Sequence, residues 1–329
     1  MVSDVANYGR LTSTLSSRRR VRCARSLFFL LFTSIVQHIS ATDDRVDYYV
    51  DYEETSAGIT AEETTTEQIF STTSSQSEND FYCREDLCLQ YDQFGELVRK
   101  THVACGHDGS FAEDCPAGRT LFKIDPQIQA FIIHLHNDAR NRLANGSLEG
   151  FESALRMPSV VWNDELAKLA EINTKSCKFE HDECRNTEQY RIAGQNLALG
   201  YYAVETDIFD ILEKLTALWF KEYRDANQTL MDVYEKPQNV TVGHFTQMMS
   251  DRTTSIGCGI VIYPHKVPGY TFKVVLFACN YSITSITGQP VYRKGPAGIK
   301  CEFGVNPYYN GLCSTEENLL IKSNPFYDE

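Results

Sequence analysis

Two stretches of the chain place apolar residues at helical spacing just after a typical helix start. In 125–146, Asp125 is a suitable N-cap and Pro126 occupies the first turn. The apolar residues of this stretch fall on one stripe, and Gly146 is suited to end the helix. A second helix is predicted from Asn163. Its predicted inner face comprises Leu166, Leu169, Ala170 and Cys177.

A third helix is predicted to start near Thr206. The residues predicted to be buried on its inner stripe are Ile208, Ile211, Leu212, Leu215, Leu218 and Trp219. Glu222 continues this stripe, four residues after Leu218. An acid on a buried face needs a partner or must stay protonated, so we expect a salt bridge or a capped backbone group there.

Further along the chain the pattern changes to that of strands. Residues 255–263 and 270–282 are rich in β-branched and aromatic residues, and a turn segment with two prolines separates them. If the two strands form a hairpin, Cys258 and Cys279 lie nearly opposite one another, where a disulfide is sterically reasonable. We expect 127–292 to form one domain with its own core.

The N-terminus has the pattern of a signal peptide, 1–41. A basic run precedes the apolar residues 26–36, and small residues lead to a cleavage position after Ala41. A signal anchor is the alternative, but the apolar run is far shorter than the roughly 20 residues that span a bilayer. We therefore expect a secreted, extracellular protein with no stable membrane insertion after cleavage.

The segment 42–80 differs in composition from the rest of the chain. It holds 13 Ser/Thr and 11 Asp/Glu residues and is predicted to be disordered. Its tyrosines Tyr48, Tyr49 and Tyr52 lie among acids, either as a solvated run or as sulfation sites. The remaining residues, 81–329, carry a net charge of −8, which argues against nucleic acid as a partner.

Ten cysteines follow the signal peptide. An even number in a secreted chain favours disulfides over thiolate metal ligands. We interpret residues 81–126 as a Cys-rich, loop-rich N-terminal extension and residues 293–329 as a C-terminal tail. His181 lies between two of the cysteines in "CKFEHDEC" (177–184). The candidate glycosylation sites are Asn145, Asn227, Asn239 and Asn280, the last within a predicted strand.

Five short motifs occur together in the domain. They are "HNDAR" (136–140), "GQNLA" (194–198), "WFKE" (219–222), "GHFTQ" (243–247) and "CNYSITSITGQPVY" (279–292). In this order they resemble the CAP superfamily of secreted proteins and, within it, the insect antigen 5 branch. The resemblance covers most of 81–313.

The resemblance implies an α+β fold, an α-β-α sandwich with a disulfide-stapled N-terminal extension. It also implies the cysteine pairing. The implied pairs are Cys83–Cys105, Cys88–Cys184, Cys115–Cys177, Cys258–Cys279 and Cys301–Cys313, the last within the tail.

The same resemblance implies a cleft formed by His181, Gln195, Glu222 and His244. The two histidines are the expected ligands of a weakly bound divalent metal such as zinc. Many members have Glu where this chain has Gln195, and an amide offers no carboxylate to a metal. On this basis Gln195→Glu is expected to strengthen metal binding.

Three functions are compatible with these features. We favour a non-catalytic extracellular protein that binds a lipid, a small ligand or a protein partner. The first alternative is a metal-dependent hydrolase that uses His181, Glu222 and His244, although no nucleophile motif accompanies them. The second is a structural extracellular protein, which would leave these histidines without a role.

Overall fold

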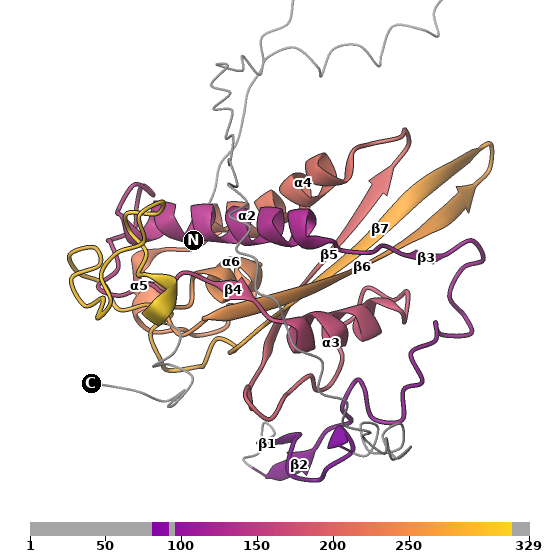
Figure 1. Ribbon diagram of the computed structural model, residues 1–329, viewed down its shortest axis with the longest axis horizontal. Coiled ribbons are helices and arrows are strands. Elements are labelled where there is room, and N and C mark those ends of the chain that lie inside the picture. Colours follow the sequence, from indigo (N-terminus) through magenta and orange to yellow (C-terminus); the bar gives the residue numbers. More distant parts are fainter. Residues whose placement is uncertain (1–80, 92–95, 318–329) are drawn as a thin grey trace, which may run out of the picture. The chain divides into compact units, whose positions relative to one another are not determined.

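A five-stranded sheet lies between two helical layers in the computed structural model, which describes residues 81–91 and 96–317 (Figure 1). Helices α2 (Pro126–Ala144), α4 (Ile208–Lys221) and α6 (Gly243–Met249) lie on one side of the sheet. Helix α3 (Asp164–Thr174) lies on the other. This arrangement is the predicted α-β-α sandwich.

The sheet is built around one long hairpin. Strand β6 (Ser255–Val267) pairs with β7 (Tyr270–Tyr281), and β5 (Gly194–Tyr202) pairs with the other side of β7. All of these pairings are antiparallel. Two short strands pair with β6: β3 (Thr120–Leu121) antiparallel and β4 (Val161–Trp162) parallel. Among the described strands, β5 therefore forms one edge of the sheet.

Outside the sheet lie several shorter elements. The extension contains the two-stranded pair β1 (Leu89–Tyr91) and β2 (Leu97–Arg99). The 3-10 turn η1 (Glu222–Asp225) directly follows α4, and α5 (Gln228–Asp232) comes next. A last 3-10 turn, η2 (Thr315–Glu317), lies in the tail.

The helix starts follow the capping residues in the sequence. The Asp125 side chain accepts a hydrogen bond from the Ile128 N–H at the start of α2, and Asn163 does the same for α3. The third helix starts at Ile208, because Asp207 caps it through the Phe209 N–H. Local sequence therefore sets these three starts to within two residues.

Three expectations about buried or turn positions were wrong. Helix α3 ends at Thr174, so Cys177 lies beyond it in a left-handed conformation (φ 56°). Leu218 is 57% exposed, because it lies at the margin of the buried stripe of α4. Strand β6 continues through Pro264 to Val267. Proline is tolerated there because β3 extends only to a position opposite Ile262, which leaves that edge of β6 open.

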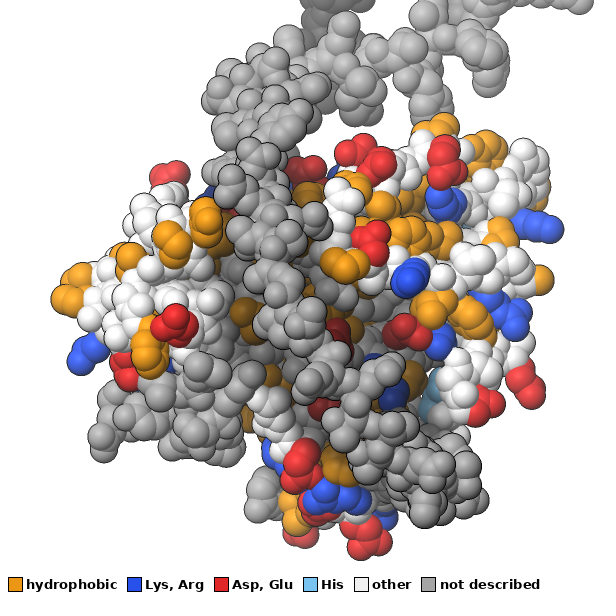
Figure 2. All heavy atoms as spheres, in the orientation of Figure 1, with side chains coloured by type: hydrophobic (Ala, Val, Ile, Leu, Met, Phe, Trp, Pro, Cys, Tyr) orange, Lys and Arg blue, Asp and Glu red, His pale blue; other side chains and the backbone are white. Residues whose placement is uncertain are grey.

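Leu218 contributes to a shallow groove between α4 and β5. The groove has a volume of about 490 Å³ and includes Tyr201, which is 55% exposed. In this part of the molecule, hydrophobic side chains are visible at the surface among charged ones (Figure 2).

Two glycines of β6 bring α3 close to the sheet. A Cβ on Gly257 would lie 2.2 Å from the Ala167 backbone nitrogen, and one on Gly259 would lie 2.4 Å from that of Glu171. No side chain fits at either position while the helix stays in place. These two glycines therefore allow the backbone of α3 to pack directly against β6.

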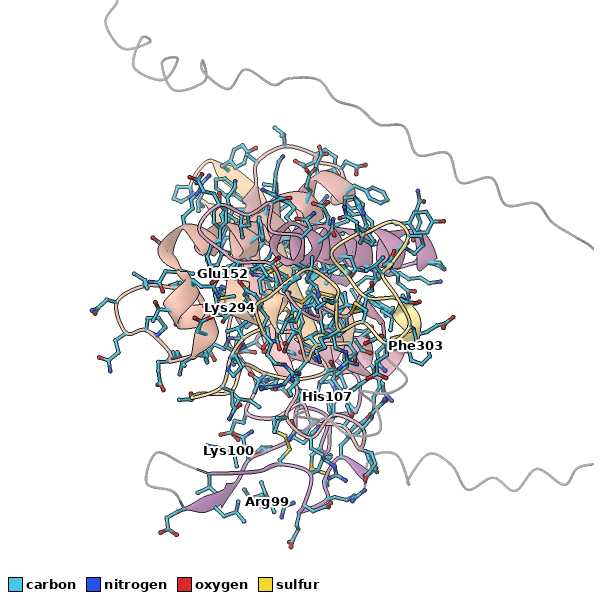
Figure 3. The ribbon with its side chains drawn as sticks, turned by 90° about the vertical axis from the view of Figure 1, so that its left-hand side faces the viewer. Arg99, Lys100, His107, Glu152, Lys294 and Phe303 are labelled. Carbon is cyan, nitrogen blue, oxygen red and sulfur yellow. A yellow bond between two sulfur atoms is a disulfide. The ribbon has the colours of Figure 1, made fainter. Side chains whose placement is uncertain are left out.

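Five disulfides join the described cysteines, in the pairs implied by the family resemblance. Two of them, Cys88–Cys184 and Cys115–Cys177, connect the extension to the chain that follows α3. Figure 3 shows Arg99 and Lys100 on the extension, away from the layers of the sandwich.

At the other end of the chain, Lys294 links the start of the tail to the domain through two ion pairs. Its ammonium group lies 3.0 Å from a Glu152 carboxylate oxygen and 2.9 Å from one of Asp232. Figure 3 shows Lys294 beside Glu152, and Phe303 on the loop of the tail. The carboxylate of Glu317, which is fully buried, accepts a hydrogen bond from Arg156 Nε (2.6 Å).

Several expectations lie outside the described residues. They concern the signal peptide 1–41, the acidic segment 42–80 with Tyr48, Tyr49 and Tyr52, and the end of the tail. Within the described ranges, none of the helices is long and apolar enough to cross a membrane.

The four candidate glycosylation sites differ in exposure. Asn227 and Asn239 are exposed and Asn145 is half-buried. Asn280 has no exposed surface, and its amide binds Gln195 and the Leu166 carbonyl. A glycan on Asn280 is incompatible with this packing, so we withdraw this candidate.

Arg140 is a fully buried charge in the sandwich. Its guanidinium donates hydrogen bonds to the carbonyl oxygens of Pro158, Met248, Ser250 and Thr253, at 2.7–3.3 Å. Burial lowers the pKa of Arg140 to about 10, so it stays charged at neutral pH. One side chain of α2 thus holds the chain before β4 and the chain between α6 and β6.

Replacing Arg140 with methionine is predicted to lower the free energy of unfolding by roughly 3–5 kcal/mol. The substitution leaves four buried carbonyl groups without their donor and removes the cation near the buried Asp251. Chemical denaturation measures the change. The control Arg224→Met alters an exposed arginine and should cost less than about 0.5 kcal/mol. Equal effects of the two substitutions would show that Arg140 has no special structural role.

Candidate functional site

Glu222 directly follows the last residue of α4, and its side chain contacts the start of α6. Its Oε2 atom accepts hydrogen bonds from the backbone N–H groups of His244 (2.9 Å) and Phe245 (3.1 Å). Helix α6 starts at Gly243, so these are two of its unsatisfied N-terminal donors. A carboxylate is well suited to this position, because the N-terminus of a helix carries partial positive charge. The acid on the stripe of α4 is therefore a backbone cap.

The second oxygen of Glu222 orients the His244 ring. Oε1 lies 2.6 Å from His244 Nδ1. An ionised carboxylate only accepts hydrogen bonds, so Nδ1 carries the hydrogen, and Nε2 of the neutral ring keeps its lone pair. The ring also stacks against Trp219, with a centroid separation of 6.1 Å. Trp219 is itself fixed by a hydrogen bond to the Leu197 carbonyl (2.9 Å).

His181 is held by Gln195 in a parallel way. Its Nδ1 atom lies 2.7 Å from Gln195 Oε1, an amide oxygen that only accepts hydrogen bonds. The hydrogen therefore lies on Nδ1, and Nε2 of the neutral ring keeps its lone pair. His181 is an exposed residue, yet desolvation of its ring by neighbouring groups lowers the pKa of His181. His181 is consequently neutral at pH 7.

Strand β5 connects the two pairs. Gln195 holds His181, and the next residue, Asn196, donates a hydrogen bond to the His244 carbonyl (3.1 Å). Neighbouring residues of β5 therefore contact the two histidines, Gln195 at the ring of His181 and Asn196 at the backbone carbonyl of His244. They are close enough that charge on His244 contributes to lowering the pKa of His181. The four residues of the predicted cleft thus form two pairs, His181–Gln195 and Glu222–His244.

A cavity of about 560 Å³ adjoins His181. One wall is the 106–113 loop of the extension, and the other is the end of α3 with residues up to Asp182. His107 lies where the extension meets the domain (Figure 3) and also lines this cavity. The disulfide Cys115–Cys177 joins the two walls. The extension therefore completes a hollow next to one of the two histidines.

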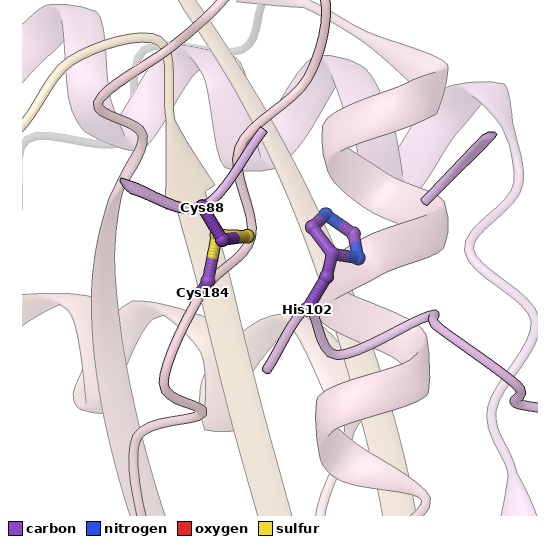
Figure 4. A group of neighbouring side chains, drawn as sticks. All are labelled: Cys88, His102 and Cys184. Carbon is purple, nitrogen blue, oxygen red and sulfur yellow. A yellow bond between two sulfur atoms is a disulfide. The ribbon is translucent and has the colours of Figure 1, made fainter. Parts of the chain in front are cut away.

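A second histidine-containing cluster has the spacing of a metal site but different chemistry. Cys88, His102 and Cys184 lie together, but the two cysteines are joined by a disulfide (Figure 4). The His102 ring accepts a hydrogen bond from the Ala104 N–H at Nδ1 and donates one to the Asn186 carbonyl from Nε2. With no thiolate and no free ring nitrogen, this cluster is structural.

Sequence reasoning missed the polar network behind the cleft. His136 donates from Nδ1 to the Ile132 carbonyl and accepts at Nε2 from the Tyr281 hydroxyl. Burial lowers the pKa of His136 to about 4, which keeps the ring neutral. Tyr281 also accepts a hydrogen bond from Asn196, beside Gln195. The motif "HNDAR" contained the signal, since His136 and Arg140 are polar residues on the apolar face of a predicted helix.

Comparison with known proteins identifies the family. A profile of the cysteine-rich secretory protein family, CAP, matches residues 133–281. Venom allergen-1 of Aedes albopictus is 38% identical over 244 residues, which are 74% of this chain and 90% of that protein. This chain belongs to the CAP family, in its antigen 5 branch. The antigen 5 like allergen Cul n 1 of Culicoides nubeculosus is 40% identical over 181 residues, 55% of this chain and 82% of that allergen.

Solved structures of related proteins are more distant in sequence. The crystal structure of NaASP2 with Zn²⁺ is 22% identical, covers 61% of this chain and all of that chain, and has a TM-score of 0.45.

The CAP family, the venom-allergen relatives and the five disulfides indicate a secreted, extracellular protein.

Replacing Glu222 with glutamine is predicted to destabilise the protein by about 1–2 kcal/mol. An amide has one acceptor oxygen, so either the α6 backbone donors or His244 Nδ1 loses its partner. Thermal denaturation measures the difference. Glu213→Gln, at an exposed position of the same helix, is the control and should change stability by less than about 0.5 kcal/mol. If the two variants unfold alike, Glu222 does not hold α6.

Proposed function

We propose that this CAP protein is an extracellular binding protein whose cleft holds one divalent metal ion between His181 and His244. The observation that carries the proposal is the pair of hydrogen bonds at Nδ1. Each ring donates from Nδ1 to a fixed oxygen, which leaves Nε2 of both rings as a potential metal ligand. Metal-ligating histidines commonly have their second nitrogen bound in this way.

The donor set fits a borderline metal such as zinc, which binds imidazole nitrogen well. Glu222 would not be a ligand, because both of its oxygens are occupied by α6 and His244. Gln195 would act in the same orienting role for His181. Two neutral ligands make a weak site with open coordination positions. Bound there, the metal would supply a Lewis acid that attracts anionic or carbonyl oxygens of a ligand.

The cavity beside His181 is where we place the ligand. It has a volume of about 560 Å³, within the usual range of small-molecule sites. Its lining combines apolar side chains such as Val103 and Phe111 with charged ones such as Lys175 and Asp182. A small amphipathic molecule suits this mixture better than a long apolar chain.

Zinc titration by calorimetry tests the metal site. We expect weak binding by the parent protein and loss of binding in His181→Ala and in His244→Ala. His265→Ala is the matched control, because that histidine is exposed on the β6–β7 hairpin, and its zinc binding should equal that of the parent. Unchanged zinc affinity in His244→Ala would overturn the shared site.

The pH dependence of zinc affinity follows from the protonation of the two rings. Zinc and protons compete for Nε2, and the pKa of His181 lies below its usual value of about 6.5. Affinity measured at several pH values should therefore be nearly constant from pH 8 to 7 and fall below about pH 6.5. Affinity that rises on acidification would exclude imidazole ligands.

A further inference from the structure

The amide of Gln195 is buried and has polar partners on both sides. Its oxygen accepts the hydrogen bond from His181 Nδ1. Its nitrogen donates to the Asp182 carboxylate (2.8 Å) and to the Asn280 side-chain oxygen (3.0 Å). Gln195 is 8% exposed, so water does not readily replace these partners.

Asp182 fixes the direction of this amide. Its Oδ2 atom accepts from Gln195 and from the Asn173 side-chain nitrogen (3.0 Å), and its Oδ1 atom accepts from Arg185 Nε (2.8 Å). A carboxylate can only accept, so the Gln195 nitrogen must face Asp182 and the oxygen must face His181. Arg185 in turn holds Asp182 through a second hydrogen bond, from its Nη2 atom to the Asp182 carbonyl (2.6 Å).

We propose that Asp182 is a positioning residue that acts through Gln195 to confine the hydrogen of neutral His181 to Nδ1. The chain Arg185–Asp182–Gln195–His181 then determines which nitrogen of the ring has a lone pair. This inference deepens the proposed metal site but does not depend on metal, because the position of the hydrogen is a property of the metal-free protein.

The same network makes a glutamate at position 195 unfavourable. A second carboxylate would face Asp182 at the 2.8 Å now spanned by a hydrogen bond, and would also face the Asn280 oxygen. The expectation that Gln195→Glu strengthens the site took account of the metal alone. Asp182 already supplies the negative charge on this side of the cleft, and Gln195 links it to His181.

Exchanging the acid and amide groups of positions 182 and 195, singly and together, tests the proposal. In Gln195→Glu, the melting temperature should fall by about 4 °C or more, because two carboxylates meet. In Asp182→Asn, the oxygen of the new amide still accepts from Arg185, and its nitrogen faces Gln195. Gln195 is then driven to turn over, and Nε2 of His181 should gain part of the hydrogen. Asn280 opposes this turn, so the shift should be partial.

The double variant Asp182→Asn, Gln195→Glu should recover part of the lost melting temperature, because the new carboxylate still faces the Asn280 oxygen. Its asparagine nitrogen donates to the new carboxylate, which again accepts from His181 Nδ1. Nitrogen-15 NMR of the histidine rings near pH 8 reports the position of each hydrogen. His244 is the internal control, since Glu222 holds its Nδ1 hydrogen in all variants.

The proposal is supported if Asp182→Asn moves hydrogen from Nδ1 to Nε2 of His181 alone and the double variant restores it. It is overturned if the hydrogen stays on Nδ1 in Asp182→Asn, or if the double variant is no more stable than Gln195→Glu. If Asp182→Asn does not fold, the double variant tests the proposal instead, because the proposal requires the double variant to fold. Failure of zinc binding with the predicted hydrogen positions would overturn the proposed function only.

Discussion

Helix α6 is held at each end by a charged side chain from another helix. Glu222, at the end of α4, accepts from two N–H groups at the start of α6, and Arg140, from α2, donates to the Met248 and Ser250 carbonyls at its end. Both charges have the sign that complements the helix dipole. A seven-residue helix has little stability of its own. The position of His244 therefore depends on these two contacts.

Glu222 and Gln195 each bind a histidine ring and a second group at the same time. Glu222 caps α6 with one oxygen and orients His244 with the other, while Gln195 joins His181 to Asp182. In each pair the hydrogen of the neutral ring is on Nδ1, so Nε2 keeps its lone pair. Glu222 and Gln195, the other two residues of the predicted cleft, each hold one histidine ring by its Nδ1 atom. The disulfides of the extension place a cavity wall beside one of these rings.

Much of this architecture could be predicted from the sequence, because it is encoded locally. Asp125, Asn163 and the paired Cys258 and Cys279 indicated helix starts and a strand register that the structure contains. The partners of Gln195 could not be predicted, since Asp182 and Asn280 reach it from a loop and from β7, and no spacing in the sequence joins them. Leu218 shows a related limit, because helical periodicity gives a stripe but not the width of the surface that covers it.

The most direct test of this account is a crystal structure of the protein soaked in zinc, with the ion located by anomalous scattering. The account predicts one ion bound by Nε2 of His181 and Nε2 of His244, at the roughly 2.0–2.1 Å of zinc–imidazole bonds. Glu222 should still contact His244 Nδ1 and the start of α6. An ion bound by a Glu222 oxygen or by Nδ1 of either ring would contradict the account.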